Sequence, residues 1–286
     1  MERKKTAIHR NERNGVPYYT FPLFEKAGLV HGFSTKLGGV SKGDCATMNL
    51  SFHRGDDPDD VMENHKRFAK AVGYDYHNLV FSDQVHKADI HVVTKDDLGK
   101  GIVRESDIKE IDGLITQDKE AVLMTFFADC VPLFFYDPVH QAIGASHSGW
   151  RGSEAKIGAR TVEAMGQAFG TRPEDLLAVI GPSICQSCYE VSEKVADKFY
   201  QNIHPDYWDE ILIEEDFRPG ETRPRYLLDL WRVNEVILMD AGIPKDQIQV
   251  SGLCTSCHSD ELFSHRVTNG KRGNLAGVIT LADPLE

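Results

Sequence analysis

The chain lacks any long hydrophobic run. None of its apolar segments approaches the roughly 20 residues of a membrane-spanning helix, and residues 1–15 are polar and charged, without the apolar stretch of a secretion signal. We therefore expect a cytoplasmic protein that does not enter a membrane. Cysteine is also scarce: six in 286 residues are too few for a disulfide framework. The thiols are expected to be free or bound to metal.

Positive charge is in deficit. The 32 Lys and Arg face 44 Asp and Glu, for a net charge of -12, whereas a nucleic-acid surface needs clustered basic residues. Nucleic acid is therefore not an expected partner, although a single local arginine can still bind a small anion. With 41% hydrophobic and 27% charged residues, the composition is that of a globular protein with a sizeable core.

Strand-like and helix-like patterns alternate to the end of the chain, with no repeat and no Pro-, Gly- or Ser-rich linker. We predict a mobile N-terminal tail over residues 1–15 and a single catalytic domain over 16–286, of the α/β or α+β class. Asp57 and Pro58 mark the start of a helix that Gly73 ends. Further expectations are a position in the core or on the helix surface for His65, neighbouring strands at 79–81 and 90–93, and a surface excursion at 204–225.

The most informative stretch is apolar, with a few polar interruptions. Leu123–Phe127, Val131–Tyr136 and Ala142–Ala145 are short aromatic or β-branched runs that predict buried strands. Cys130 and His147 then lie at strand ends. A thiolate and an imidazole in such a place make either a nucleophile with its base or two thirds of an open zinc site.

Two further features add to this pair. His86 follows another apolar strand and is a third candidate ligand. The segment Ser148–Gly152 has two glycines and Arg151 before a helical pattern. Such a helix N-terminus can hold an anion through backbone N–H groups and a guanidinium.

Two CxxC pairs, Cys185/Cys188 and Cys254/Cys257, supply the four thiolates of a tetrahedral zinc site. The interval between the pairs is, however, several times the roughly 15 to 20 residues of a zinc ribbon. Spacing alone therefore favours unlinked thiols over a shared zinc or a redox role.

The chain resembles a bacterial family first described as multicopper polyphenol oxidases, or laccase-like proteins, and now treated as zinc-containing purine nucleoside phosphorylases. The resemblance runs from about residue 30 to the C-terminus, and its motifs occur in the family's order. They are HGFST at 31–35, GGVS at 38–41, MNL at 48–50, GDD at 55–57, QVH at 84–86, DGL at 112–114, ADCVP at 128–132, HSGWRG at 147–152, GPSI at 181–184, CYEV at 188–191, CT at 254–255 and FSHR at 263–266.

This resemblance implies a YfiH-like α+β fold, a single domain of packed mixed β-sheets flanked by α-helices. It implies Zn²⁺ held by His86, Cys130 and His147, which would also be the catalytic residues. The implied activity is phosphorolysis of adenosine and inosine, with methylthioadenosine cleavage and adenosine deamination beside it. Purine nucleosides and inorganic phosphate are the expected partners, and a monomer or homodimer is the expected assembly.

For that activity, Arg151 with the following backbone amides is the candidate phosphate cradle. Asn49 and Gln84 are candidates for reading hydroxyls or purine edges, and Asp129 for orienting a ligand. Near the C-terminus, His265-Arg266-Val267 stands where the family pattern suggests an aromatic residue and two arginines, and the closing Gly-Arg of the pattern is displaced into residues 270–273. This departure bears on substrate contacts rather than on the metal.

Three other functions stay open. Imidazole and thiolate also bind copper, so Cu²⁺ taken up in vitro could support phenol oxidation, although the 12 histidines do not cluster as a multicopper enzyme needs. Cys130 with His147 as base could form a metal-free hydrolase. A non-enzymatic binding protein would turn over no nucleoside.

Overall fold

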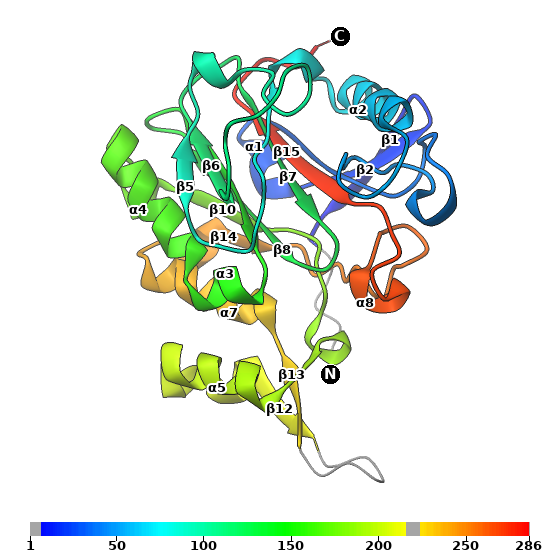
Figure 1. Ribbon diagram of the computed structural model, residues 1–286. Coiled ribbons are helices and arrows are strands. Elements are labelled where there is room, and N and C mark those ends of the chain that lie inside the picture. Colours follow the sequence, from blue (N-terminus) through cyan, green and yellow to red (C-terminus); the bar gives the residue numbers. More distant parts are fainter. Residues whose placement is uncertain (1–6, 216–223, 286) are drawn as a thin grey trace.

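The computed structural model describes residues 7–215 and 224–285, which form one α+β domain of two large mixed sheets with helices outside (Figure 1). The strands are β1 His9–Arg13, β2 Val16–Thr20, β3 Val30–Ser34, β4 Leu79–Val80, β5 Ile90–Val92, β6 Gly113–Thr116, β7 Val122–Phe127, β8 Val131–Asp137, β9 Ala142–Ser148, β10 Leu177–Ile180, β11 Glu190–Val191, β12 Leu212–Glu215, β13 Arg225–Leu228, β14 Ile248–Val250 and β15 Leu275–Thr280. The α-helices are α1 Pro22–Lys26, α2 Pro58–Val72, α3 Trp150–Glu154, α4 Ile157–Phe169, α5 Glu193–Asn202, α6 Trp208–Ile211, α7 Leu230–Asp240 and α8 His265–Thr268.

The strands form three sheets. The first has the order β1-β2-β3-β15-β7-β4, the second β14-β10-β8-β9-β6-β5, and a small third sheet β11-β13-β12. Both large sheets mix parallel and antiparallel pairs: β4 runs parallel to β7, and β8 antiparallel to β9. The predicted α+β fold of packed mixed sheets is therefore confirmed.

The core follows from side-chain alternation along the strands. In β8, Phe134 points into the layer between the two large sheets, whereas Leu133 and Phe135 point to the opposite face. Adjacent side chains of a strand face opposite sides, so a central strand that is apolar throughout is buried on both. Gly277 in β15 shows how closely the sheets approach, because an added Cβ would collide with the ring of Phe134.

Helices cover the outer faces. The α4 and α7 helices pack on the second sheet, and α2 packs on the first through Phe68. The predicted helix at 58–72 is confirmed with its caps: the Asp57 side chain accepts from Asp59 N–H, and Gly73 adopts the left-handed conformation. The described residues contain no helix that is both long and apolar enough to cross a membrane.

The predicted N-terminal tail is wrong over part of its length. Residues 1–6 lie outside the described residues, but His9–Arg13 forms an edge strand paired with Val16–Thr20. Asn14 and Gly15, at φ 55° and 73°, make the tight turn between them, and Asn-Gly is a strong hairpin signal. The strand is polar and mostly exposed, so the sequence shows no hydrophobic pattern from which it could be predicted.

Two other expectations are corrected. The strands at 79–80 and 90–92 are not neighbours, because β4 pairs with β7 in the first sheet and β5 with β6 in the second. The expected surface excursion at 204–225 contains the helix α6 and the strand β12, which pairs with β13. Residues 216–223 of that excursion lie outside the described residues. His65, for which the sequence left the core and the helix surface open, is buried against Phe52 and Phe81.

Candidate metal centre

Three side chains come together where two connections between the large sheets pass the end of β9. The parallel strands β4 and β7 end at the same edge of the first sheet, and each is followed by a connection to the second sheet. The first connection carries His86 and the second Cys130, while His147 lies near the end of β9. Their ligand atoms all lie within 4.8 Å of one another. The Sγ of Cys130 is 3.8 Å from Nε2 of His86.

A buried carboxylate holds this arrangement. Asp112 is fully buried and accepts the Nδ1–H of His147 at 2.8 Å. It also accepts the backbone N–H groups of Val85, His86 and Lys87 at 2.9–3.0 Å. One residue thus orients two of the three candidate ligands and leaves Nε2 of His147 to face the centre. Metal-ligating histidines characteristically have such a partner.

The sequence pattern did not single out Asp112, although this residue begins the Asp-Gly-Leu motif. The signal in the sequence was an Asp placed directly before a buried strand. A carboxylate in that place has no solvent to hydrate it, so it needs hydrogen-bond donors from the protein. Its role depends on three backbone amides from a distant loop, which no spacing rule anticipates.

The local backbone is shaped for close approach. His86 and Asp129 have φ values of 63° and 82°, a left-handed conformation that non-glycine residues seldom adopt and that concentrates at functional sites. At Gly149, an added Cβ would lie 2.9 Å from Cδ2 of His86 and 3.1 Å from the Cys130 sulfur. The start of α3 therefore touches the centre, and only glycine fits there.

The electrostatics favour a ligating thiolate. Burial raises the pKa of Cys130, but the charge of His147 and hydrogen bonds from both histidines outweigh burial and lower this pKa to about 6. Burial lowers the pKa of His147, yet Cys130 and Asp112 raise it to about 9. Without a metal, Cys130 and His147 therefore form a thiolate–imidazolium pair. A bound zinc ion would displace the His147 proton, because zinc takes thiolate and neutral imidazole ligands, and these three residues are of the types that fit a single metal ion.

One side of the centre faces solvent. His86 is exposed and Cys130 half-buried, whereas His147 is buried. Three ligands with an accessible side match a catalytic metal site, in which a fourth position is kept for water or substrate. A structural site would surround the ion with four protein ligands.

Several cationic groups lie near the centre. Arg151 is exposed at the start of α3, with its guanidinium 4.2 Å from the Trp150 ring centre. Arg54 and Arg272 lie together; burial and the charge of Arg54 lower the pKa of Arg272 to about 10, although Cys130 and Asp129 oppose this. Among the described residues neither arginine of this pair forms an ion pair with a carboxylate. In the sequence, Arg272 stands out only as part of the displaced Gly-Arg motif.

The other candidate substrate residues are engaged within the protein. The side chain of Asn49 bonds to Ser51, Asp56 and Asn274. Both ends of the Gln84 amide bond to the backbone of Phe126. Direct contact of either side chain with a substrate stays a prediction.

Asp129 joins the centre to a distant loop. Its carboxylate accepts hydrogen bonds from Thr255 Oγ1, Ser264 Oγ and the backbone N–H of Arg266, at 2.6, 3.1 and 2.7 Å. It therefore anchors residues 255–266 next to Cys130. A role in orienting a ligand would act through this loop.

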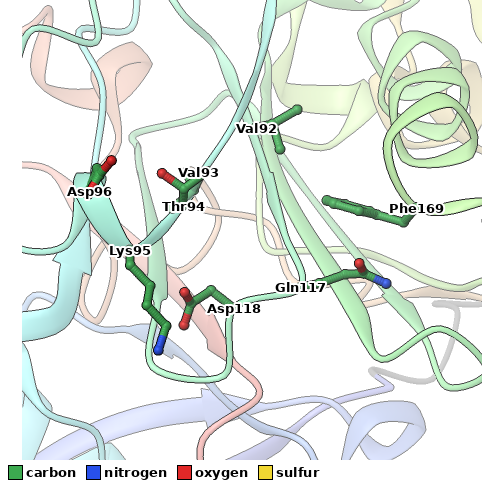
Figure 2. Close-up of a pocket in the computed structure, with 8 residues that line it drawn as sticks. All are labelled: Val92, Val93, Thr94, Lys95, Asp96, Gln117, Asp118 and Phe169. Carbon is green, nitrogen blue, oxygen red and sulfur yellow. The ribbon is translucent and has the colours of Figure 1, made fainter.

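A separate open pocket of about 470 Å³ lies beyond the end of β5 (Figure 2). Thr94, Lys95, Gln117 and Phe169 are among its lining residues. None of the three candidate ligands lines it, so this pocket is not the centre described above.

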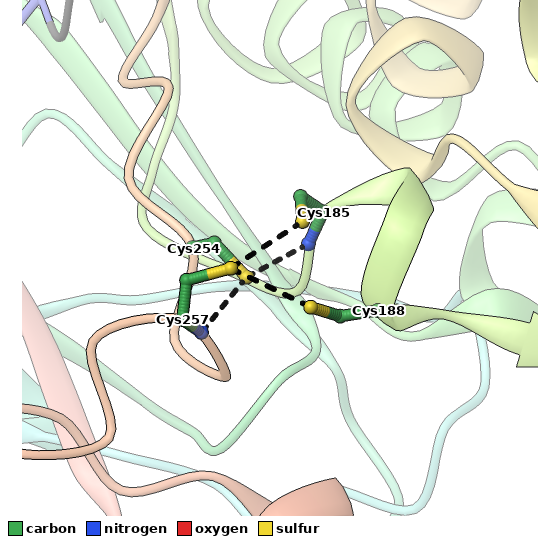
Figure 3. Close-up of side chains that lie close together, drawn as sticks. All are labelled: Cys185, Cys188, Cys254 and Cys257. Carbon is green, nitrogen blue, oxygen red and sulfur yellow. Dashed lines mark hydrogen bonds between the residues drawn. The ribbon is translucent and has the colours of Figure 1, made fainter. Parts of the chain in front are cut away.

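The inference that the two CxxC pairs are unlinked is wrong. Cys185, Cys188, Cys254 and Cys257 converge, with all four sulfurs within 4.8 Å of one another (Figure 3). The spacing rule failed because the intervening residues form helices and strands of the main domain rather than a small ribbon. All six cysteines are free thiols in the structure.

Comparison with known proteins places this chain in a family. Residues 30–282 match the family model described as multi-copper polyphenol oxidoreductase laccase. A protein of Bacillus subtilis named purine nucleoside phosphorylase YlmD is 38% identical over 258 residues, or 89% of each chain. A protein of Bacteroides thetaiotaomicron named purine nucleoside phosphorylase is 33% identical over 90% of this chain and 93% of its own.

Solved structures agree on the fold. The crystal structure of YlmD from Geobacillus stearothermophilus superposes with a TM-score of 0.86 at 35% identity, over 99% of this chain and 100% of that one. The hypothetical protein YfiH of Bacillus licheniformis gives the same TM-score at 36% identity, over 97% and 99%. The chain therefore belongs to the multi-copper polyphenol oxidoreductase laccase family, in which its curated relatives carry the name purine nucleoside phosphorylase.

Proposed function

We propose that this protein is a purine nucleoside phosphorylase that cleaves adenosine and inosine at a zinc site formed by His86, Cys130 and His147. The observation that carries the proposal is the convergence of these three ligands within 4.8 Å, braced by Asp112 and open on one side. The names of the relatives supply the reaction class.

The donor set selects the metal. Two imidazoles and one thiolate suit zinc, which takes nitrogen and sulfur ligands in a tetrahedral arrangement. When bound, zinc would supply a Lewis acid that polarises a ligand in the open position. The hydrogen bond from His147 to Asp112 keeps Nε2 of His147 directed at that ion, and the ionised Cys130 supplies a negative ligand.

Phosphorolysis requires a phosphate beside the ribose. The bond between the ribose C1′ and the purine nitrogen breaks with its electron pair leaving on the base, and an oxygen of hydrogen phosphate forms the new bond to C1′. The proton of the hydrogen phosphate ends on the base nitrogen. The products are the free base and ribose 1-phosphate. Arg151 is our candidate for binding the phosphate, because Gly149, two positions before it, lies so near His86 and Cys130 that an added Cβ would collide with them.

Two further activities belong to the same proposal. Methylthioadenosine differs from adenosine only at the 5′ position of the sugar, away from the bond that breaks. Deamination of adenosine needs attack of water at the purine carbon that bears the amino group, which a metal-activated water performs in other deaminases. Asn49 and Gln84 would then shape the nucleoside pocket through the backbone segments that they hold.

Copper-dependent phenol oxidation is the alternative that the family description names. A multicopper enzyme needs many histidines in closely spaced groups. The candidate metal groups of the described residues are the centre with two histidines and the all-cysteine cluster. The geometry therefore supports a hydrolytic or phosphorolytic metal site better than an oxidase.

The test is product analysis with metal determination. Protein purified without added metal is incubated with adenosine or inosine, with and without phosphate. We expect zinc in the protein, and free base with ribose 1-phosphate only when phosphate is present; inosine from adenosine marks deamination. Bound copper together with phenol oxidation would establish the oxidase. Turnover by metal-free protein would establish the Cys–His hydrolase, and no turnover would indicate a binding protein.

Phosphate binding is tested separately with Arg151→Ala. Loss of one charge-assisted contact should raise the phosphate KM by about 10-fold or more, since such contacts are worth about 1.5–3 kcal/mol. Arg172→Ala is the matched control, because Arg172 pairs with Asp175 near the far end of β8 from Cys130. If only Arg272→Lys changes the phosphate KM, the cradle lies at Arg54 and Arg272 instead.

A further inference from the structure

We infer that Cys185, Cys188, Cys254 and Cys257 form a second metal site, which binds one structural zinc ion. This site is distinct from the His86, Cys130 and His147 centre in ligands and in purpose. It accounts for four of the six cysteines, which the phosphorylase reaction does not use.

The sulfur separations match one tetrahedral ion. A Zn–S bond is about 2.3 Å, so two sulfurs at a tetrahedral zinc are about 3.8 Å apart. Here Sγ of Cys257 is 3.5 Å from Sγ of Cys188 and 4.0 Å from Sγ of Cys185. All four sulfurs lie within 4.8 Å, which leaves room for a single ion and none for a larger cluster.

The backbone around the cluster is arranged to support negative sulfur. The N–H groups of Cys185 and Cys257 both point to Sγ of Cys254, at 3.2 and 3.4 Å (Figure 3). Such N–H···S contacts stabilise a ligating thiolate, as hydrogen bonds to ligand side chains do at metal sites generally. One donor comes from each CxxC segment, so the two segments are already fitted to each other around the sulfurs.

Four thiolates leave no open coordination position. Zinc sites with four protein ligands are structural, whereas catalytic sites keep one position free. Cys254 is buried, Cys185 and Cys188 are half-buried, and Cys257 is exposed. The cluster therefore reaches from the interior to the protein surface. A closed site in that place is suited to fastening two segments together.

The two segments that the zinc would join, one after β10 and one after β14, both contact Asp129. The chain after β10 bonds to the chain after β14, with Ser183 N–H donating to Leu253 O and Thr255 N–H to Ser183 O. Ile184 N–H donates to the backbone carbonyl of Asp129, whose carboxylate accepts from Thr255. The proposed zinc would thus stabilise the two segments that lie next to Cys130 without taking part in the reaction.

The first test counts zinc in the purified, intact protein. Wild-type chain should hold two zinc ions, and His86→Ala, which removes an exposed ligand of the other centre, should hold one. Cys188→Ser with Cys257→Ser should also reduce the count from two to one. Cys45→Ser is the matched control, since Cys45 is a buried thiol outside both groups, and it should leave two ions bound.

The second test identifies the ligands. Cobalt(II) substituted into His86→Ala should show the intense near-ultraviolet sulfur-to-cobalt absorption of a four-thiolate tetrahedral site. Blocking thiols with a mercurial should release one zinc from His86→Ala, measured with a colorimetric chelator.

Several results would overturn the inference. A His86→Ala protein that folds and binds no metal would refute the site, as would a disulfide among these cysteines found by mass spectrometry. Iron in place of zinc would refute the assigned metal. If the double cysteine variant does not fold, the His86→Ala count still decides. Loss of phosphorylase activity alone would concern the other centre, because these tests read metal rather than turnover.

Discussion

The two cysteine-containing centres of this molecule differ in what surrounds their sulfur. At Cys130 the thiol has two histidines and one open side, and the buried Asp112 fixes the geometry from behind. At Cys185 and its partners the sulfurs surround the space between them, and backbone amides support Cys254. The first arrangement leaves access for a reactant, whereas the second closes it. Ligand number and access, rather than the presence of cysteine, separate a reactive centre from a structural one.

The largest expected difference comes from removing one sulfur at each centre. Cys130→Ser should lower kcat/KM for inosine by at least about 10³-fold, because a catalytic metal supplies several kcal/mol of transition-state stabilisation. Cys257→Ser should retain activity within about 10-fold but lower the Tm by at least about 5 °C, since it removes a stabilising ion. Steady-state kinetics measure kcat/KM, and thermal unfolding measures the Tm, of the two variants. Equal kinetic effects would erase the distinction between the centres.

A smaller effect is expected at the carboxylate behind the first centre. In Asp112→Asn the amide cannot accept all four hydrogen bonds that the carboxylate accepts, so the orientation of His147 and of the His86 loop is weakened. We expect the zinc affinity of this centre to fall by about 10- to 100-fold, with activity largely regained at saturating zinc. Competition with a chelator measures it. The four-cysteine site should keep its affinity, and a parallel loss there would indicate general unfolding.

The smallest effect should come from the link between the centres. Thr255→Val removes the hydrogen bond to Asp129 while preserving shape, which should cost about 1–3 kcal/mol because the acceptor is charged. The change in Tm should be a few degrees, and kcat/KM should fall only a few-fold. Chemical denaturation and kinetics check both. Thr268→Val, which removes a neutral bond to Ser264 O, is the control and should change kcat/KM less.

Local patterns predicted much of this molecule because they depend on neighbouring residues. The helix at 58–72 was recognisable from Asp57, Pro58 and Gly73, since caps act within a few positions. The central strands were recognisable because β8 is buried on both faces, and its residues 131–136 are accordingly almost all apolar. The edge strand at 9–13 was missed because only its Asn-Gly turn, and no burial, distinguishes it.

The candidate site was predictable in its residues but not in its geometry. Polar side chains seldom interrupt apolar strands, and this pattern indicates Cys130, His147 and His86 as candidates. The family resemblance, and not the pattern, implied that the three share one zinc ion. The role of Asp112 was not visible, because its partners come from a loop about 26 residues earlier in the chain and a strand about 35 later.

From the sequence we could predict the central strands, the helix at 58–72, the three candidate ligands and, through the motifs, the family. The fold was needed to show which sheet each strand joins, that Asp112 holds two of the candidate ligands, and that the two distant CxxC pairs converge. The physical reason is that periodicity and capping are short-range, whereas metal sites and buried carboxylates depend on where the chain returns in space. That return is set by how the two sheets pack, which no local pattern encodes.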